Sequence, residues 1–580
     1  MTMKNNIKMG IIGVLVTGLV INYSCNDSFL EVPVTGQLDE GILSSRQGLE
    51  SSLIAVYSQV NGRANRMASP SNWVWGSIRG AEANKGTDPG DFSDINPIQR
   101  YEALPTQGVV RDKYVGNYEG VARANSTLKL LTKAAPDVPA DIKTSIEAQA
   151  KFLRAHYYFE LKRAFGDTPY VDESVDYGTG IELVKNDVDL WPKIEEDMMF
   201  AYNNLPETQA QVGRVNKWAA AAYLAKIYMY QKKFSEAKAL YDIIIPNGKT
   251  SNGKAYGLVP LYANVFKASN DNHEESVWSY QAAANTGSVN NANPEFDLNW
   301  PYNTGADGPG NCCSFFQPTF TLANSFRTSG GLPLLDESYN APGNELKTDM
   351  GLETADPFTP DAGPLDPRID HSIGRRGIPY LDWMDFPGKA WIRNQPNAGP
   401  YQTKKFVYYK SDKGSLQDNS SWTPGYTAIN FPIIRFADVL LMAAEAEIEV
   451  GSLATALDYT NRVRARAANP AGFVMKNGAP AANYVINLYA PFANQDEARK
   501  VVRFERKLEL SGEGHRFFDL VRWGTADEEL NAYLAYEAPK LPLGALNGAS
   551  YTSGQDELLP IPQDQIDLLG TDVLQQNPGY

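Results

Sequence analysis

Helical stretches at both ends of the chain, separated by a long region without helical period, constrain the fold most. Residues 141–165 carry apolar side chains at helical spacing, and the same pattern predicts helices at residues 116–133 and 187–204. The Gly-Asp-Thr-Pro run at residues 166–169 ends the first of these helices. Residues 247–430 are instead rich in Gly, Pro, Asn and aromatic side chains. A helical scaffold that carries ordered loops is therefore expected.

One predicted helix pair, at residues 217–231 and 234–245, has the spacing of a tetratricopeptide hairpin. Ala225 and Ala237 are the small residues that let two helices approach closely, and Tyr228 and Tyr241 occupy the aromatic positions. A second pair, within residues 435–468, keeps the small positions but has Glu and Thr at the aromatic ones. The sequence thus predicts a mainly α fold, with a tetratricopeptide-like helical hairpin scaffold and a large loop-rich, mixed insertion carrying short strands.

The N-terminus has the anatomy of an export signal. Lys4 and Lys8 precede an apolar run at residues 9–21, which is too short to span a membrane and ends just before Cys25. A cysteine at the cleavage site of a bacterial signal accepts a lipid anchor, although Asn22 stands where leucine is usual. An ordinary signal peptide with an unrelated cysteine is the alternative.

These features predict the organisation of the whole chain. In order, we expect a signal peptide (1–24), a lipidated tether (25–40) and a single domain (41–580), with a helical scaffold at about 41–246 and 431–525, a loop-rich ligand-binding insertion at about 247–430 and a closing segment at 526–580.

Composition excludes several classes of protein. Lys and Arg number 53 against 68 Asp and Glu, a net charge of -15 that argues against nucleic-acid binding. A mean hydropathy of -0.37 argues against a polytopic membrane protein. Three cysteines cannot build a disulfide framework. Cys312 and Cys313 are either a vicinal disulfide or, the preferred interpretation, two reduced buried thiols.

Signatures of catalysis are missing from the sequence. There is no Gly-x-Ser-x-Gly or His-Glu-x-x-His motif, and the four histidines are scattered singly. We therefore expect no catalytic residue and no cofactor. Asp88, Asp91 and Asp94 form a weak calcium candidate, for which an Asx-rich turn is the preferred interpretation.

Several sequence motifs carry a family resemblance. The run RFERKLELSGEGHRFFDLVRWG at residues 503–524 resembles the C-terminal signature of the SusD/RagB family of outer-membrane nutrient-binding lipoproteins. Residues 366–368 (Asp-Pro-Arg), 559–562 (Leu-Pro-Ile-Pro), 576–580 (Gln-Asn-Pro-Gly-Tyr) and 25–31, from the cysteine to Phe-Leu-Glu, resemble further family motifs. Physically, Glu505 and Glu509 lie on one helical face, and with Arg516 and Arg522 they predict an ion-pair network.

The resemblance implies a cell-surface, lipid-anchored protein of the outer membrane. Its ligand would be an oligosaccharide or polysaccharide, delivered to a SusC-like TonB-dependent transporter over which the protein acts as a lid. A surface-anchored glycoside hydrolase and a peptide-uptake lid are the alternatives.

An aromatic platform in the loops is the predicted ligand site, with Trp300 as its leading residue because no helical or strand period surrounds it. The candidate ligand-binding residues are Trp300, Tyr302, Asn303, Trp383, Trp391, Trp75 and Phe92. The alternative is that Trp300 pins its own loop to the scaffold.

Overall fold

The computed structural model describes residues 40–62, 67–288, 291–292, 298–310, 312–418 and 426–580. The predicted signal peptide, Cys25 and nearly all of the tether lie outside these residues. The helices are α2 (Glu40–Ser44), α3 (Arg46–Tyr57), α4 (Asn96–Gln99), α5 (Gly108–Leu131), α6 (Ala140–Phe165), α7 (Trp191–Asn204), α8 (Lys217–Tyr230), α9 (Phe234–Asn247), α10 (Phe320–Ser325), α11 (Ile369–Ser372), α12 (Gln395–Ala398), α13 (Phe436–Val450), α14 (Leu453–Ala467), α15 (Gln495–Glu509), α16 (Arg516–Trp523), α17 (Ala526–Glu537) and α18 (Gln563–Leu569).

Strands in the described part of the chain pair only as antiparallel two-stranded sheets. They are β1 (Ala83–Gly86) with β3 (Phe315–Pro318), β2 (Ser276–Tyr280) with β12 (Phe431–Arg435), β4 (Thr328–Ser329) with β5 (Leu332–Pro333), β6 (Ile373–Gly374) with β9 (Gln402–Thr403), β7 (Pro379–Tyr380) with β8 (Met384–Asp385), β10 (Gln417–Asp418) with β11 (Tyr426–Thr427), and β13 (Met475–Lys476) with β14 (Ala479–Pro480).

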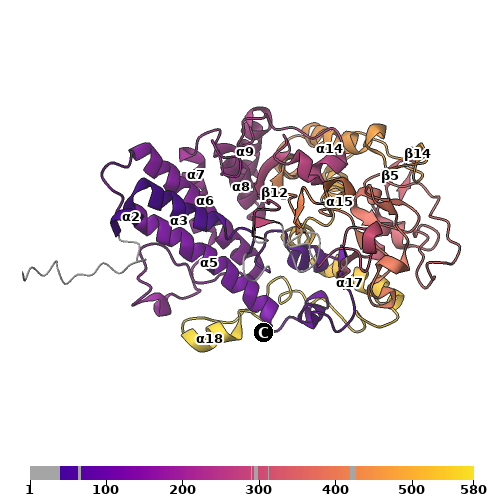
Figure 1. Ribbon diagram of the computed structural model, residues 1–580, viewed down its shortest axis with the longest axis horizontal. Helices are drawn as coiled ribbons and strands as arrows, with labels where there is room; N and C mark the ends of the chain where they lie inside the picture. The colour runs from indigo at the N-terminus through magenta and orange to yellow at the C-terminus, as the bar shows by residue number, and fades with distance from the viewer. Residues whose placement is uncertain (1–39, 63–66, 289–290, 293–297, 311, 419–425) are drawn as a thin grey trace, which may run out of the picture.

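Helices α2, α3, α5, α6 and α7 lie together at one end of the molecule, whereas α14 and α15 lie toward the other end, where β5 and β14 are found (Figure 1). Successive helices from α5 to α9 contact one another, and α13 contacts α9, α14 and α15. The fold class predicted from sequence, a mainly helical scaffold with a strand-bearing, loop-rich insertion, is confirmed.

The first tetratricopeptide-like hairpin is α8 with α9. Asn216 caps α8, since its side chain accepts a hydrogen bond from the Ala219 amide. Ala225 and Ala237 are fully buried and Tyr241 nearly so, which is the close approach that the spacing predicts. The burial of these small residues lets the two helices meet along their length.

In the second hairpin, α13 with α14, polar residues stand at the positions that aromatic rings occupy in the first. Glu447 occupies an aromatic position, but its carboxylate accepts a hydrogen bond from the Ser452 amide and pairs with Lys238 of α9. This buried glutamate therefore joins one hairpin to the next. Within the described residues no helix is long and apolar enough to cross a membrane.

The predicted ion-pair network exists, but its partners differ from those expected. Glu505 and Glu509 are fully buried and pair with arginines outside the C-terminal run. These arginines are Arg368, which pairs with both acids, Arg464, which pairs with Glu505, and Arg435 and Arg466, which pair with Glu509. Arg516 and Arg522 pair elsewhere, with Glu529 and Glu445. The network thus ties α15 to the insertion and to α14, because complete burial requires every charge to be matched.

Candidate functional site

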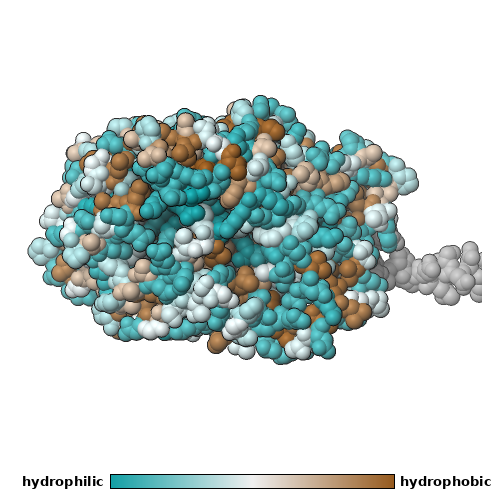
Figure 2. Space-filling model, turned by 180° about the vertical axis from the view of Figure 1, so that it is seen from behind, coloured by the Kyte–Doolittle hydropathy of each residue, from teal (hydrophilic) through white to brown (hydrophobic). Residues whose placement is uncertain are grey.

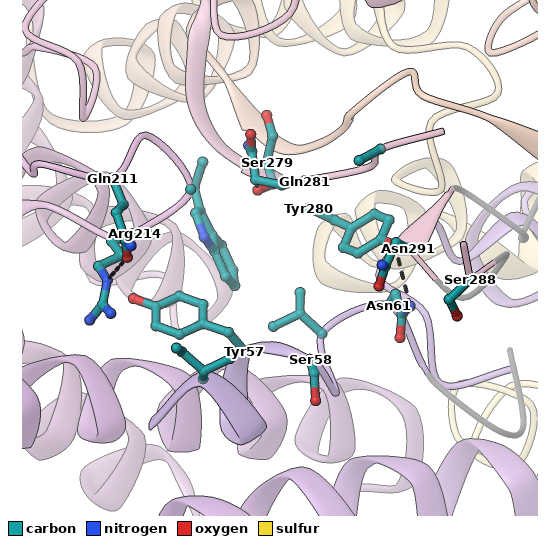
Figure 3. A pocket seen from close by; sticks show the side chains of 15 residues that line it. Tyr57, Ser58, Asn61, Gln211, Arg214, Ser279, Tyr280, Gln281, Ser288 and Asn291 are labelled. Atoms are coloured by element: carbon teal, nitrogen blue, oxygen red, sulfur yellow. Dashed lines mark hydrogen bonds between the residues drawn. The ribbon is translucent and has the colours of Figure 1, made fainter. Parts of the chain in front are cut away.

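A cavity of about 490 Å³ lies between α3, the loop that precedes α8 and strand β2 (Figure 3). Its volume is in the range of small-molecule sites in proteins. The lining residues are Ile54, Tyr57, Ser58, Val60, Asn61, Gln211, Gly213, Arg214, Trp278, Ser279, Tyr280, Gln281, Ala283, Ser288 and Asn291. Two kinds of group dominate this list, aromatic rings and uncharged polar side chains.

Strand β2 supplies two of the aromatic rings. Trp278 and Tyr280 are two residues apart, so both side chains leave the same face of the strand. Trp278 is held from behind by edge-on contacts with Phe152 and His156, each at a centroid distance of 4.8 Å. Tyr280 is half-buried, and its hydroxyl donates to the Ala292 carbonyl at 3.1 Å. Both rings are thereby fixed before any ligand arrives.

On the opposite wall, α3 and the loop before α8 contribute Tyr57 and Arg214 (Figure 3). The Tyr57 hydroxyl donates to Gln149 at 2.9 Å and accepts from the Val215 amide at 3.1 Å. Burial raises the pKa of Tyr57, so this phenol is neutral at physiological pH. Arg214 donates to Gln211 at 2.6 Å and pairs with Glu50 at 2.7 Å, which leaves the wall close to neutral overall.

Side-chain amides complete the lining, and hydrogen bonds behind the cavity orient them. Asn430 donates to the Gln281 carbonyl oxygen at 3.0 Å, and its own backbone amide donates to Asp271 at 3.2 Å. Asn61 donates to the Tyr280 hydroxyl at 3.3 Å. None of the described lining residues is an acid. Flat rings beside fixed amides can bind a polyhydroxylated ring, since rings stack on C–H faces and amides pair with hydroxyls.

The tryptophans predicted to form a platform lie elsewhere, in a separate buried cluster. This tryptophan cluster consists of Trp300, Tyr380, Trp383, Phe386, Trp391, Ile392, Val407 and Tyr408. Trp300 is 0% exposed and meets Tyr408 edge-on at 5.4 Å. The prediction of an exposed platform is wrong for Trp300, Trp383 and Trp391, because the loops of the insertion need an apolar core of their own and these rings form it.

Trp75 is also buried, since its ring is 1% exposed and its Nε1 donates to the Met67 carbonyl at 2.8 Å. It belongs to the main hydrophobic core and offers no surface to a ligand.

Three of the candidate residues are at least partly exposed, and one of them, Tyr302, contacts Arg393. This loop patch comprises Phe92, Tyr302, Asn303 and Arg393. Asn303 is exposed, and Phe92 is 38% exposed. The Arg393 guanidinium lies over the Tyr302 ring at 5.4 Å. The Tyr302 amide donates to the Trp391 carbonyl at 2.8 Å, so the tryptophan cluster supports the patch from below.

The weak calcium candidate is an Asx turn. Asp88 accepts from the amides of Gly90 and Asp91, each at 2.9 Å, and pairs with Arg393 at 2.6 Å. Asp91 also pairs with Arg393, and Asp94 accepts from the Gly108 amide. Across the described ranges no group of acids, histidines or cysteines has the arrangement of a metal site. The two hydrogen bonds from backbone amides to the Asp88 side chain form the Asx turn that the sequence favours.

The structure joins Cys312 and Cys313 in a vicinal disulfide. The structure therefore corrects the interpretation that the sequence analysis preferred, two reduced thiols. Cys313 is buried and Cys312 partly so, beside the main core.

Two family models match the chain, and together they span most of it. The model described as "SusD family" matches residues 274–580, more than half of the chain. The model described as "Starch-binding associating with outer membrane" matches residues 43–229. The chain therefore belongs to the SusD family, as its C-terminal signature indicates.

Individual relatives are distant but cover most of the chain. SusD-like protein P2 of Formosa agariphila is 24% identical over 90% of this chain and 91% of its own length. The starch-binding protein SusD of Bacteroides thetaiotaomicron is 24% identical over 75% of this chain and 72% of its own.

Solved structures share the fold. A laminarin-binding SusD-like protein superposes with a TM-score of 0.63 at 24% identity, covering 92% of this chain and 99% of that one. Surface glycan-binding protein A of Bacteroides thetaiotaomicron, in complex with laminarihexaose, gives a TM-score of 0.60 at 21% identity with the same coverage.

Proposed function

We propose that the protein binds an oligosaccharide in the cavity between α3 and β2. The observation that carries this proposal is the lining itself, in which Tyr57, Trp278 and Tyr280 alternate with fixed amides around about 490 Å³. Laminarin and laminarihexaose, named for two proteins of the same fold, are the first ligands to test.

In this proposal the aromatic rings of the cavity bind the sugar, and its side-chain amides determine which sugar binds. A pyranose ring stacks on the half-buried rings of Tyr57 and Tyr280, where little conformational entropy remains to be lost. Trp278, which is 5% exposed, forms the apolar floor behind them. Asn61 and Gln281 exchange hydrogen bonds with the hydroxyls of the sugar. Since the amides are already oriented from behind, a sugar whose hydroxyls do not match leaves them unpaired, and this favours one glycan over others.

The test is a calorimetric screen of the mature protein against laminari-, malto-, cello- and xylo-oligosaccharides. We expect one class to bind and the Gln281→Ala variant to bind it at least about tenfold more weakly. If no oligosaccharide in a broad panel binds, the proposed function fails. If binding is unaffected by Gln281→Ala but lost in Tyr302→Ala, the glycan occupies the loop patch, whose Phe92, Tyr302 and Asn303 are the second location proposed.

We also propose that the protein is an outer-membrane lipoprotein of the cell surface, anchored through Cys25. The motivation is the export signal that ends at this cysteine, together with a matching family description that places its members at the outer membrane. Cys25→Ala should yield protein that no longer sediments with membranes. Continued sedimentation would mean that a different anchor exists.

Delivery to a SusC-like TonB-dependent transporter is the proposed next step, and family membership alone supports it. A pull-down in mild detergent should recover a large outer-membrane barrel with the protein. Recovery of the protein without any barrel contradicts the partnership.

Binding without cleavage is the proposed mode of action. A glycosidase needs two carboxyl groups that face each other across the ligand, and the described lining of the cavity has none. Purified protein should release no reducing ends from an oligosaccharide that it binds. Such release would favour the hydrolase alternative, and preferential binding of peptides in the same screen would favour a peptide-uptake lid.

A further inference from the structure

A second pocket, of about 190 Å³, lies where α8, α13, α15 and α16 meet. It is formed by the tetratricopeptide-like helices and shares no residue with the cavity. Its charged and aromatic lining consists of Lys232, Glu445, Glu449, Arg499, Arg503, Arg522 and Trp523. Four cations face two acids there, although the chain as a whole carries a net charge of -15.

Both acids of the pocket are already satisfied. Arg499 binds Glu449 with two parallel hydrogen bonds, at 2.7 and 2.8 Å. Arg522 binds Glu445 in the same way, at 2.6 and 2.8 Å, and the Trp523 Nε1 adds a third bond to Glu445 at 3.0 Å. Two-point pairing of this kind fixes the arginines as well as the acids.

Arg503 is a cation of this pocket that has no acidic partner among the described residues. Among the described residues no carboxylate or carbonyl lies within pairing distance of its guanidinium, which stacks over Trp523 at 5.0 Å. Burial lowers the pKa of Arg503, with Glu445 opposing the shift and Arg522 and Arg499 adding to it. The Lys232 ammonium at the pocket likewise has no ion-pair partner in the described chain. A half-buried, unpaired guanidinium beside other cations is stabilised by a bound anion.

We propose that this pocket binds a carboxylate-bearing sugar unit, with Arg503 pairing with the carboxylate and the sugar ring lying against the uncovered part of Trp523. The volume is on the scale of a single ring, because sites for whole drug-sized ligands begin at about 300 Å³. Trp523 is half-buried, and the guanidinium groups of Arg516 and Arg522 also lie over its ring, at 5.6 and 4.9 Å. A sugar can therefore contact only the part of the ring that the arginines leave uncovered. The site is distinct from the cavity, and the two can fail separately.

The experiment titrates the mature protein with glucuronate, glucose and acetate by calorimetry at low ionic strength. Glucuronate should bind saturably and weaken as salt is added, because the carboxylate is the main contact. Glucose lacks the charge and acetate lacks the ring, so each should bind at least about tenfold more weakly. No saturable binding of glucuronate, or equal binding of glucose or acetate, overturns the proposal.

Arg503→Gln is the diagnostic variant and should lose at least about tenfold in glucuronate affinity. Arg462→Gln is its matched control. Arg462 also stacks on aromatic rings, at 5.8 Å from Phe436, and has no ion pair within the described residues, but it does not line the pocket. Unchanged glucuronate binding in Arg503→Gln, or equal losses in both variants, overturns the assignment. Gln281→Ala should keep its glucuronate affinity, which separates this site from the proposed cavity.

Discussion

Two regions of the molecule contain the same Trp-x-Tyr sequence and use it differently. In strand β2, Trp278 and Tyr280 both line the cavity. In the insertion, Trp300 is buried in the tryptophan cluster, whereas Tyr302 lies at the surface beneath Arg393. Both side chains of the first pair line one cavity, whereas the second pair has one side chain in the core and the other at the surface.

Strand pairing explains the difference. Residues 276–280 pair with β12, so alternate side chains leave the same face, and Trp278 and Tyr280 stay together. Pro301 separates Trp300 from Tyr302, and proline cannot donate to a strand ladder. Only an isolated bridge joins Trp300 to Cys313. Two aromatic residues in a short motif therefore reach one ligand only where the backbone between them is held extended.

The largest expected effect concerns the buried member of the second pair. Trp300→Ala removes a fully buried ring from the tryptophan cluster and should lower the free energy of unfolding by about 3–5 kcal/mol. Urea denaturation followed by circular dichroism measures this loss. Affinity for the glycan, measured on the folded fraction, should be unchanged.

Tyr302→Ala is the control for that experiment, since the Tyr302 ring is partly exposed and should cost little stability. Loss of glycan binding in Trp300→Ala at unchanged stability would restore the ring as a ligand contact. The tryptophans of both pairs would then be ligand contacts, and the difference between the two regions would disappear.

The second prediction addresses the pair on the strand. Tyr280→Ala removes a ring from the cavity wall and should weaken glycan binding by about 1–3 kcal/mol, a roughly 5- to 150-fold change in Kd. Calorimetry with the oligosaccharide identified in the screen measures it. Tyr302→Ala, at the same position of the same motif, should leave Kd unchanged. If Tyr302→Ala has the larger effect, the loop patch is the site.

The helices of the scaffold could be predicted from the local sequence, because helix periodicity and the residues that end a helix are signals that act over a few residues. The predicted helices at 141–165, 217–231 and 234–245 match α6, α8 and α9 to within a few residues. The second hairpin was also predicted, although nothing local indicates that Glu447 pairs with Lys238 from another hairpin.

The cavity was not predicted because its parts come together only in the tertiary structure. Tyr57 ends a helix near the N-terminus, and Arg214, Trp278 and Tyr280 follow much later in the chain. One local signal was available, since Trp278, Ser279 and Tyr280 are large, small and large, which places the two aromatic residues two apart as on one face of a strand. The absence of a helical period around Trp300 was misleading, because a loop of a large insertion can build a core without any period.

A glycine in the cavity wall allows a smaller, steric test. A Cβ atom at Gly213 would lie 2.7 Å from the Gln281 Cγ, so Gly213→Ala should push Gln281 out of position. We expect glycan affinity to fall by about 1 kcal/mol, the lower end of the cost of overpacking. Gly257→Ala is the control, because its nearest contact, the Glu274 Cγ, is at an ordinary 3.6 Å. Equal affinities in the two variants would mean that Gln281 does not contact the glycan.

The last expected effect is a pH dependence that belongs to the cavity and not to the tryptophan cluster, whose members include no carboxylate. Behind the cavity, Asp271 accepts from the Asn430 amide, and Asn430 orients Gln281. Burial raises the pKa of Asp271 to about 8, the Asn430 amide opposes the shift and Asp412 adds to it. The folded protein therefore holds this proton more tightly than the unfolded chain does.

The contribution of protonated Asp271 to stability is complete below the unfolded pKa of about 4 and is lost as pH rises through about 8. Asp271→Asn cannot lose a proton, so its stability relative to the natural protein should rise between pH 5 and 8, by less than about 1.4 kcal/mol per pH unit. Urea denaturation of both proteins at each pH measures the difference, in which all other titrating groups cancel. The same subtraction with Trp300→Ala should show no slope between pH 5 and 8, because its cluster contains no carboxylate or histidine. Parallel curves for Asp271→Asn and the natural protein would show that Asp271 is ionised throughout, and that the amides of the cavity are held without its proton.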